Sequence, residues 1–285
     1  GAILHTIDAL DCDAVTSAWL RVVFASVIRN ASNADPVPVS GLEVTSHMKR
    51  LDAAGRVIDP FSLFVTALRR AERANAAYWN ARTTSEVVDV EVRLEDATSY
   101  VPSTEVSTII TSPPYQNAVD YYRRHQLEMF WLGLTRTQRD RLDLLPKYIG
   151  KHRVAASNPI LTSEWEPTAA AADWLQQMEA SDAGRARDFR AYMVSMNNVF
   201  ERWHETLAPG RLAVCVVGRS SWNGADIPTE ELFVELAHGR FTLSEHLTYP
   251  VKNRYMSYER RNGANIQEEH VLVLRREADY RDDVV

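Results

Sequence analysis

Residues 106–115 read VSTIITSPPY, an apolar run that leads into Ser112, two consecutive prolines and Tyr115. The run 106–111 shows little alternation, which is typical of a strand buried on both faces of a parallel sheet. Proline has no amide hydrogen and fixes φ, so the two prolines end the strand and start a stiff turn. In open α/β sheets, ligands bind at the carboxyl ends of the strands. This stretch therefore predicts a parallel strand that ends at a functional site.

Strands and helices alternate on both sides of this stretch. Residues 88–94 alternate apolar and charged side chains, which predicts a strand with one wet face or an edge strand. Residues 212–217 are apolar throughout and residues 270–274 predict the last strand. Helical patterns occupy residues 13–30, 60–79, 117–134, 169–178, 188–207 and 229–238, and Asp13 and Asp59, the latter followed by Pro60, are predicted to cap the first two of these helices. The alternation indicates an α/β layered domain.

Composition limits the class of protein. The 285 residues allow one large or two modest domains, and 45% apolar with 25% charged residues is typical of a globular chain. None of the eleven glycines lies within two positions of another, which excludes a G-x-G nucleotide loop. Cys12 and Cys215 offer neither a disulfide framework nor a CxxC site, so we expect a reducing, cytoplasmic setting without a membrane segment. The histidines show no ligand spacing, so no metal site is expected.

The run TSPPYQNAVDYYRRHQLEMFWLGL, residues 111–134, resembles one branch of the bacterial site-specific DNA amino-methyltransferases. In that family, SPPY is the catalytic motif of enzymes that transfer a methyl group from S-adenosylmethionine to the exocyclic amino group of cytosine or adenine in DNA. Residues 207–218 and 266–276 resemble the family's fifth strand and late hairpin. The resemblance implies a Rossmann-like S-adenosylmethionine-dependent methyltransferase sheet, with N-terminal helices and a helical insertion. It also implies that double-stranded DNA is the partner.

The chemistry explains why these residue types suit the motif. An aromatic amine is a poor nucleophile because its lone pair is delocalised, and in a duplex the base must first be flipped out. The hydroxyl of Ser112 and the carbonyl of Pro113 would accept the two amino hydrogens, while Pro114 keeps these acceptors still. Tyr115 would stack on the flipped base. Serine at the first position favours cytosine N4, and adenine N6 remains the alternative.

Further contacts follow from the resemblance and from the residue types. Basic residues interleaved with tyrosines can contact phosphates and stack on bases, although a solvated loop is the simpler alternative. The residues predicted to bind DNA are Asn117, Tyr121, Arg123, Arg124, Lys252, Arg254, Arg260 and Arg261. Asp96, at the acidic position after the third strand, and Thr111 are assigned to the methyl donor. A basic cluster at residues 147–153 is a candidate for target recognition.

One part of the family pattern is missing. No F-x-G-x-G donor loop occurs, and Asp59-Pro60-Phe61 is rejected as its start because residues 62–64 supply no glycine and continue a helix. The resemblance implies two further strands between residues 88–94 and the SPPY strand. Three alternatives stay open: a segment of a longer chain supplies the donor-binding half, a second protein chain supplies it, or the chain is a non-catalytic DNA-specificity or assembly subunit.

The expected organisation follows from these assignments. Residues 1–85 form an N-terminal helical segment, residues 86–135 and 188–277 form the methyltransferase core, and residues 136–187 form an insertion that is a candidate target-recognition region.

Overall fold

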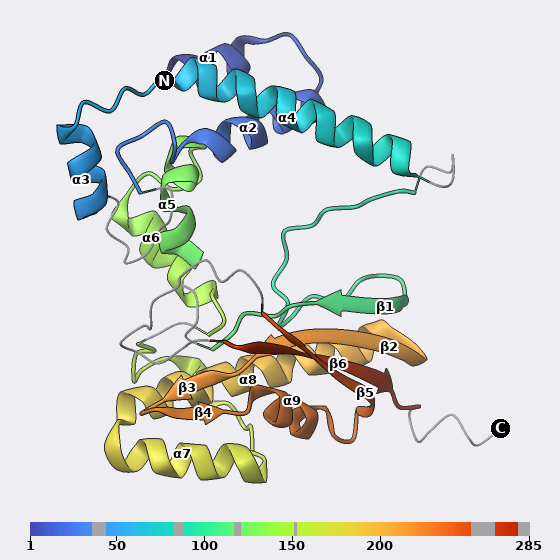
Figure 1. Cartoon of the computed structure of the whole chain (residues 1–285). Coiled ribbons are helices and arrows are strands. Elements are labelled where there is room, and N and C mark those ends of the chain that lie inside the picture. The colour runs from blue at the N-terminus through green and yellow to red at the C-terminus, as the bar shows by residue number, and fades with distance from the viewer. Residues whose placement is uncertain (36–43, 83–87, 117–120, 151–152, 252–265, 279–285) are drawn as a thin grey trace. The chain divides into compact units, whose positions relative to one another are not determined.

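A computed structural model of the chain describes residues 1–35, 44–82, 88–116, 121–150, 153–251 and 266–278. The chain is a mixed α/β protein that divides into two compact units (Figure 1). Unit 1 comprises residues 1–92 and 121–143, and unit 2 comprises residues 93–120 and 144–285. None of the helices in the described ranges is both long and apolar enough to cross a membrane.

Unit 1 is helical. Its elements are α1 (Ala2–Ala9), α2 (Ala14–Val27), α3 (Ser46–Ala53), α4 (Pro60–Ala81), α5 (Tyr121–Trp131) and α6 (Gln138–Leu144). The predicted caps are confirmed, because the Asp13 carboxylate accepts from the amides of residues 15 and 16, and Asp59 accepts from those of residues 61 and 62. The helix predicted over residues 117–134 is present as α5, while residues 117–120 lie outside the described residues.

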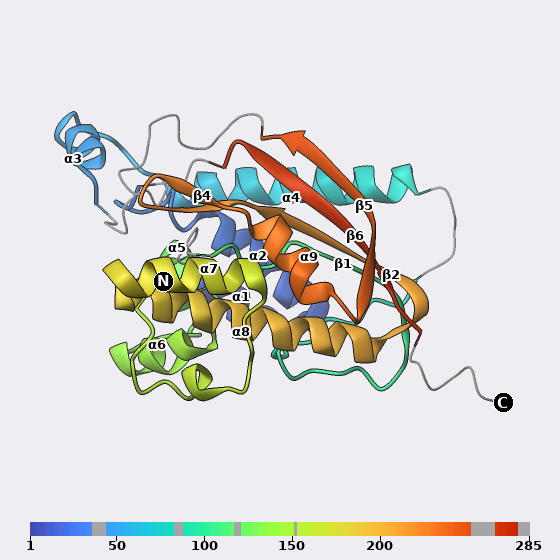
Figure 2. The same ribbon diagram turned by 90° about the horizontal axis from the view of Figure 1, so that it is seen from below.

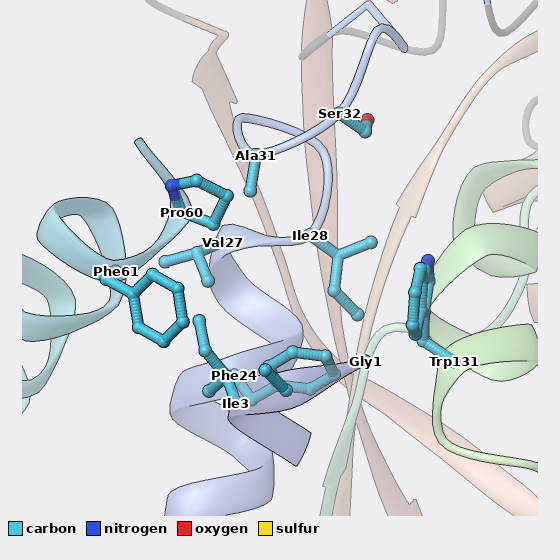
Figure 3. A pocket seen from close by; sticks show the side chains of 11 residues that line it. Gly1, Ile3, Phe24, Val27, Ile28, Ala31, Ser32, Pro60, Phe61 and Trp131 are labelled. Atoms are coloured by element: carbon cyan, nitrogen blue, oxygen red, sulfur yellow. The ribbon is translucent and has the colours of Figure 1, made fainter. Parts of the chain in front are cut away.

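The packing of unit 1 brings α1, α2, α4 and α5 together. Arg29, just after α2, is 9% exposed, and its guanidinium donates to Glu128 Oε1 at 3.1 Å and to the carbonyl of Arg124 at 2.7 Å. An apolar pocket of about 220 Å³ lies beside these helices, with Phe24 and Trp131 among its lining residues (Figure 3). None of the residues predicted to carry chemistry lines this pocket.

Unit 2 contains a mixed four-stranded sheet, in the order β1-β2-β6-β5 (Figure 2). Strand β1 (Val106–Thr111) runs parallel to β2 (Leu207–Gly218), and β6 (Glu268–Arg276) runs antiparallel to both β2 and β5 (Phe241–Pro250). The three strands predicted at residues 106–111, 212–217 and 270–274 are therefore confirmed. The predicted burial of residues 106–111 on both faces is wrong, because β1 is the last strand of the described sheet on its side. The resemblance implied a late hairpin, but the residues of its partner strand β5 were not predicted. A small hairpin, β3 (Ser220–Trp222) with β4 (Ala225–Ile227), follows β2.

Helices cover one face of this sheet. The long helix α8 (Ala183–Thr206) and the short helix α9 (Thr229–Ala237) pack on β2, and α7 (Ala169–Ser181) packs on α8 (Figure 1). Two 3-10 turns, η1 (Leu145–Lys147) and η2 (Pro159–Thr162), precede them. Alternate residues of β2 and β6 point into this core and are fully buried: Ala213, Cys215, Val217, Leu272 and Leu274. The predicted helices at residues 169–178, 188–207 and 229–238 are confirmed with shifted ends.

The opposite face of the sheet is apolar near its centre, where no described helix covers it. Ile110, Val214 and Val273 lie side by side in register across β1, β2 and β6, and the Ile110 side chain is 76% exposed. Leu247 of β5, opposite Val271, is 54% exposed. Among the described residues, no strand pairs with the outer edge of β1. Unit 2 thus carries an apolar sheet face and a free parallel edge.

The strand predicted over residues 88–94 is wrong. These residues form no strand, and Val92 and Leu94 are 91% and 101% exposed. Alternating hydrophobicity stabilises a strand only when a neighbouring strand satisfies its amides and a core covers its apolar face. Among the described residues, this segment has neither a neighbouring strand nor a core that covers it, so its alternating sequence does not form a strand.

Candidate active site

The SPPY motif begins where the parallel pair of strands ends. Thr111, the last residue of β1, lies opposite Cys215 of β2, and the chain then leaves the sheet through Ser112 and the buried Pro113. Strand β2 ends three residues further on, at Gly218. The motif therefore lies at the carboxyl edge of the parallel strands, as the sequence predicts.

Hydrogen bonds link the motif to the β5–β6 hairpin. The Ser112 hydroxyl donates to the Tyr115 phenol at 3.3 Å, and that phenol donates to Glu269 Oε1 at 2.9 Å. The phenol of Tyr249, on β5, donates to the other carboxylate oxygen, Glu269 Oε2. Burial, with the hydrogen bond and charge of Glu269, raises the pKa of Tyr115 well above its usual value. The hydrogen bond that the Tyr249 phenol donates to Glu269 also raises the pKa of Tyr249.

The turn after the motif is held from α8. The phenol of Tyr192, which is 2% exposed, donates to the carbonyl of Pro114 at 3.0 Å. Gly150 has a φ of +77°, and a Cβ there would lie 3.3 Å from the carbonyl oxygen of Tyr115. Helix α8 and the segment that contains Gly150 thus contact the backbone of residues 114 and 115. This packing keeps the turn in one conformation.

A buried polar cluster lies directly after β2. Arg219 Nε donates to Glu230 Oε1 at 2.7 Å, and Glu230 is 1% exposed in the first turn of α9. This hydrogen bond raises the pKa of the Arg219 guanidinium. The Ser220 hydroxyl donates to the buried Gln116 Oε1 at 3.3 Å. The cluster joins the end of the motif, the end of β2 and the start of α9.

Gly218 makes room for the Tyr115 ring. An ideal Cβ at this position would lie 3.1 Å from Tyr115 Cε2, and 2.9 Å and 3.0 Å from Cγ2 and Cδ1 of Ile266. We expect Gly218→Ala to reduce the free energy of unfolding by about 1–3 kcal/mol through overpacking, measured by urea denaturation. The double variant Gly218→Ala/Ile266→Ala removes two of the three close contacts and should recover part of the loss. A Gly218→Ala protein as stable as the wild type would contradict this account.

Several predicted site residues lie away from this arrangement or outside the description. Asp96 is exposed, and its Oδ1 accepts from the amide and hydroxyl of Thr98 at 2.9 and 2.7 Å, which caps a turn. Arg124 is exposed on α5 of unit 1. The side chains of Tyr121 and Arg123 are not described, and the residues outside the described ranges are Asn117, Lys252, Arg254, Arg260 and Arg261. Within the described ranges, no cluster of His, Cys, Asp and Glu could hold a metal ion.

The sequence did not single out Tyr192, Gly218, Tyr249 or Glu269. Each lies far from the motif along the chain, and only the strand register and the packing of α8 bring them together. One signal was available: Glu268 and Glu269 open a strand whose central residues 271–274 are apolar, so one of the two acidic residues must face the same side as Val271 and Val273.

Comparisons with known proteins find only weak similarity to this chain. No family model and no curated protein matches the sequence. Among solved structures, a chain described as a "Putative DNA Modification Methylase" from Thermus thermophilus is 16% identical, with a TM-score of 0.34; the match covers 66% of this chain and 55% of that one. Its selenomethionine derivative is 20% identical, with a TM-score of 0.26, over 34% of this chain and 41% of that one. Such values establish no common fold.

Proposed function

We propose that this chain is a site-specific DNA amino-methyltransferase, or the catalytic half of one, that acts on the N4 amino group of a flipped cytosine. The observation that carries the proposal is the rigid SPPY turn at the carboxyl edge of the β1–β2 parallel pair. Ser112 is exposed there, while the prolines and Tyr115 behind it are held by Tyr192 and Glu269. Fixed acceptors at a sheet edge suit a reaction that must orient an amine.

Each residue of the motif has a role in the proposed reaction. The Ser112 oxygen and the Pro113 carbonyl accept the two hydrogens of the exocyclic amine, so that the nitrogen lone pair points away from the base plane. Tyr115 provides an aromatic surface for the base, and aromatic stacking on a base contributes about 1–3 kcal/mol. Serine at the first position of the motif favours cytosine, and adenine N6 is the alternative target.

The donor site of this chain is incomplete. S-adenosylmethionine would supply the methyl group when bound, and Asp96 and Thr111 are the residues that we assign to it. However, Asp96 already caps an exposed turn, and no pair of closely spaced glycines exists to let a backbone approach the donor. The residues present therefore do not fit the whole donor.

The sheet of unit 2 supports the proposal that further strands, outside the described residues, belong next to β1. The free edge of β1 and the uncovered apolar face beside it are features that stable sheets pair or cover. Further strands next to β1, from a longer chain or from a second protein chain, would complete a Rossmann-like sheet. They would also give the segment at residues 88–94 the neighbours that it lacks.

Binding of double-stranded DNA is assigned to residues around the motif and to the loop before β6. They are Asn117, Tyr121, Arg123, Arg124, Lys252, Arg254, Arg260 and Arg261. Within this proposal, residues 86–135 and 188–277 form the catalytic core, residues 136–187 are an insertion for target recognition, and residues 1–85 are an N-terminal helical segment.

Nucleoside mass spectrometry tests the proposal. Unmethylated genomic DNA is incubated with S-adenosylmethionine and the chain, alone or co-purified with candidate partner chains, and then digested. N4-methylcytosine supports the proposal, and N6-methyladenine instead would replace cytosine by adenine as the target. No methylated base in any preparation would refute methyl transfer by this site.

A non-catalytic DNA-specificity or assembly subunit is the second candidate. The lack of a glycine-rich donor loop favours it. Photocrosslinking of S-adenosylmethionine distinguishes the two functions, because a subunit of this kind should bind DNA without ever labelling at residues 96–115, whether or not a partner is present.

A further inference from the structure

The proposed reaction requires the Ser112 oxygen to be an acceptor. A serine hydroxyl can donate one hydrogen bond and accept others, and free rotation leaves both roles open. An amine hydrogen can be bound only if the hydroxyl proton of Ser112 points elsewhere. The neighbours of Ser112 therefore decide whether it serves in the reaction.

A carboxylate ends the hydrogen-bond chain that starts at Ser112. An ionised carboxylate only accepts hydrogen bonds, so the Tyr115 phenol, 2.9 Å from Glu269 Oε1, must donate to it. The phenol oxygen is then left to accept, and the Ser112 hydroxyl 3.3 Å away donates to it. Such chains polarise their members in one direction. The Tyr249 phenol occupies the second carboxylate oxygen and holds Glu269 in place.

The sheet register places Glu269 for this contact. Glu269 of β6 lies opposite Gly218 of β2 on one side and Tyr249 of β5 on the other. Because Gly218 has no side chain, the Tyr115 ring can lie over β2 and reach the carboxylate. Any larger residue at 218 would fill the space between the motif and Glu269. Glycine, glutamate and tyrosine thus occupy one row across three strands.

We propose that Glu269 is a positioning residue of the methyl-transfer site, which acts through Tyr115 to keep the Ser112 oxygen free as an acceptor for the exocyclic amine. The inference rests on the proposed function. It assigns the direction of each hydrogen bond in the chain from Ser112 through Tyr115 to Glu269. The raised pKa of both phenols agrees with this direction, since protonated phenols donate.

The kinetic test is Glu269→Gln, measured in the preparation that methylates DNA. A glutamine amide can also donate, so the direction of the chain is no longer fixed. We expect kcat to fall by about 10- to 100-fold, while KM for DNA changes by less than about 2-fold, as for the loss of a hydrogen bond to a charged group. The matched control is Glu268→Gln, the same change one residue earlier at a 51% exposed side chain. This control should leave kcat unchanged.

A second readout needs neither DNA nor donor. NMR titration of protein labelled at tyrosine Cζ follows the ionisation of each phenol, and Tyr115→Phe identifies the signal of Tyr115. Burial is the largest cause of the raised pKa of Tyr115, and the hydrogen bond and charge of Glu269 add to it, so Glu269→Gln should make Tyr115 ionise at lower pH, whereas Glu268→Gln should not. An unchanged titration would refute the hydrogen-bond chain.

The two readouts separate the possible failures. A shifted titration with unchanged kcat would overturn the positioning role while leaving the hydrogen-bond chain intact. If the wild type methylates no DNA in any preparation, the proposed function fails and the inference fails with it, even where the titration shift is observed. Equal losses of kcat in Glu269→Gln and Glu268→Gln would also overturn the inference, because they would indicate a general effect of charge.

Discussion

Arg219→Ala is expected to lower the free energy of unfolding of unit 2 by about 1–3 kcal/mol. The substitution removes the guanidinium that binds Glu230 Oε1 and leaves this carboxylate, whose side chain is 2% exposed, without that partner. The Arg219 side chain itself is 39% exposed, so the loss is that of a buried acceptor left unsatisfied and not of a fully buried ion pair. Hydrogen exchange of the β2 and α9 amides in increasing urea measures the effect in the unit that contains the pair.

Arg202→Ala is the matched control for this loss. Arg202 lies on α8 of the same unit and pairs with Glu205 at 2.7 Å, and the two pairs differ in the burial of the carboxylate, since the side chain of Glu205 is 46% exposed and that of Glu230 is 2% exposed. Exposed pairs contribute less than about 1 kcal/mol. Adding Glu230→Gln to Arg219→Ala should restore part of the stability because it removes the buried charge. If Arg219→Ala and Arg202→Ala cost the same, burial of Glu230 does not determine the energy of the pair.

The sequence predicted the elements whose signals are local. Asp13 and Asp59 with Pro60 mark helix starts because capping needs only the residues of the first turn. The apolar runs at residues 106–111 and 212–217 predict neighbouring parallel strands, as β1 and β2 are, but the predicted burial on both faces is wrong for β1, where Ile110 is 76% exposed. The position of SPPY after β1 follows from the strand end alone. Each of these predictions depends on fewer than about ten consecutive residues.

The parts of the fold and of the site that the sequence did not predict depend on contacts between segments far apart along the chain. Residues 88–94 have a regular alternation but no neighbouring strand, so the pattern alone could not form a strand. Strand β5 was missed because its residues after Phe241 are exposed and polar in part, and only pairing with β6 identifies it. The role of Glu269 depends on a register that places it opposite Gly218. No local pattern contains that information.

Replacing Tyr115 has the largest expected effect on function. Under the proposed function, Tyr115→Ala removes both the aromatic surface assigned to the flipped base and the phenol proposed to orient Ser112, so we expect kcat for methyl transfer to fall by about 10²- to 10³-fold. Pro113→Ala should also abolish most methylation, because a flexible turn no longer holds the acceptors. Tritium transfer from labelled S-adenosylmethionine to DNA measures both losses, and unchanged turnover in both variants would refute the site.

DNA affinity should be largely retained in these variants. Phosphate contacts, which dominate affinity, are assigned to basic residues elsewhere in the chain, and electrophoretic mobility shifts at fixed salt can verify this. Tyr115→Phe then separates the two roles of the tyrosine. If the ring alone matters, Tyr115→Phe should methylate at nearly the wild-type rate. If the phenol sets the direction of the hydrogen bond from Ser112, Tyr115→Phe should lose as much kcat as Glu269→Gln, because both changes interrupt the same chain of hydrogen bonds.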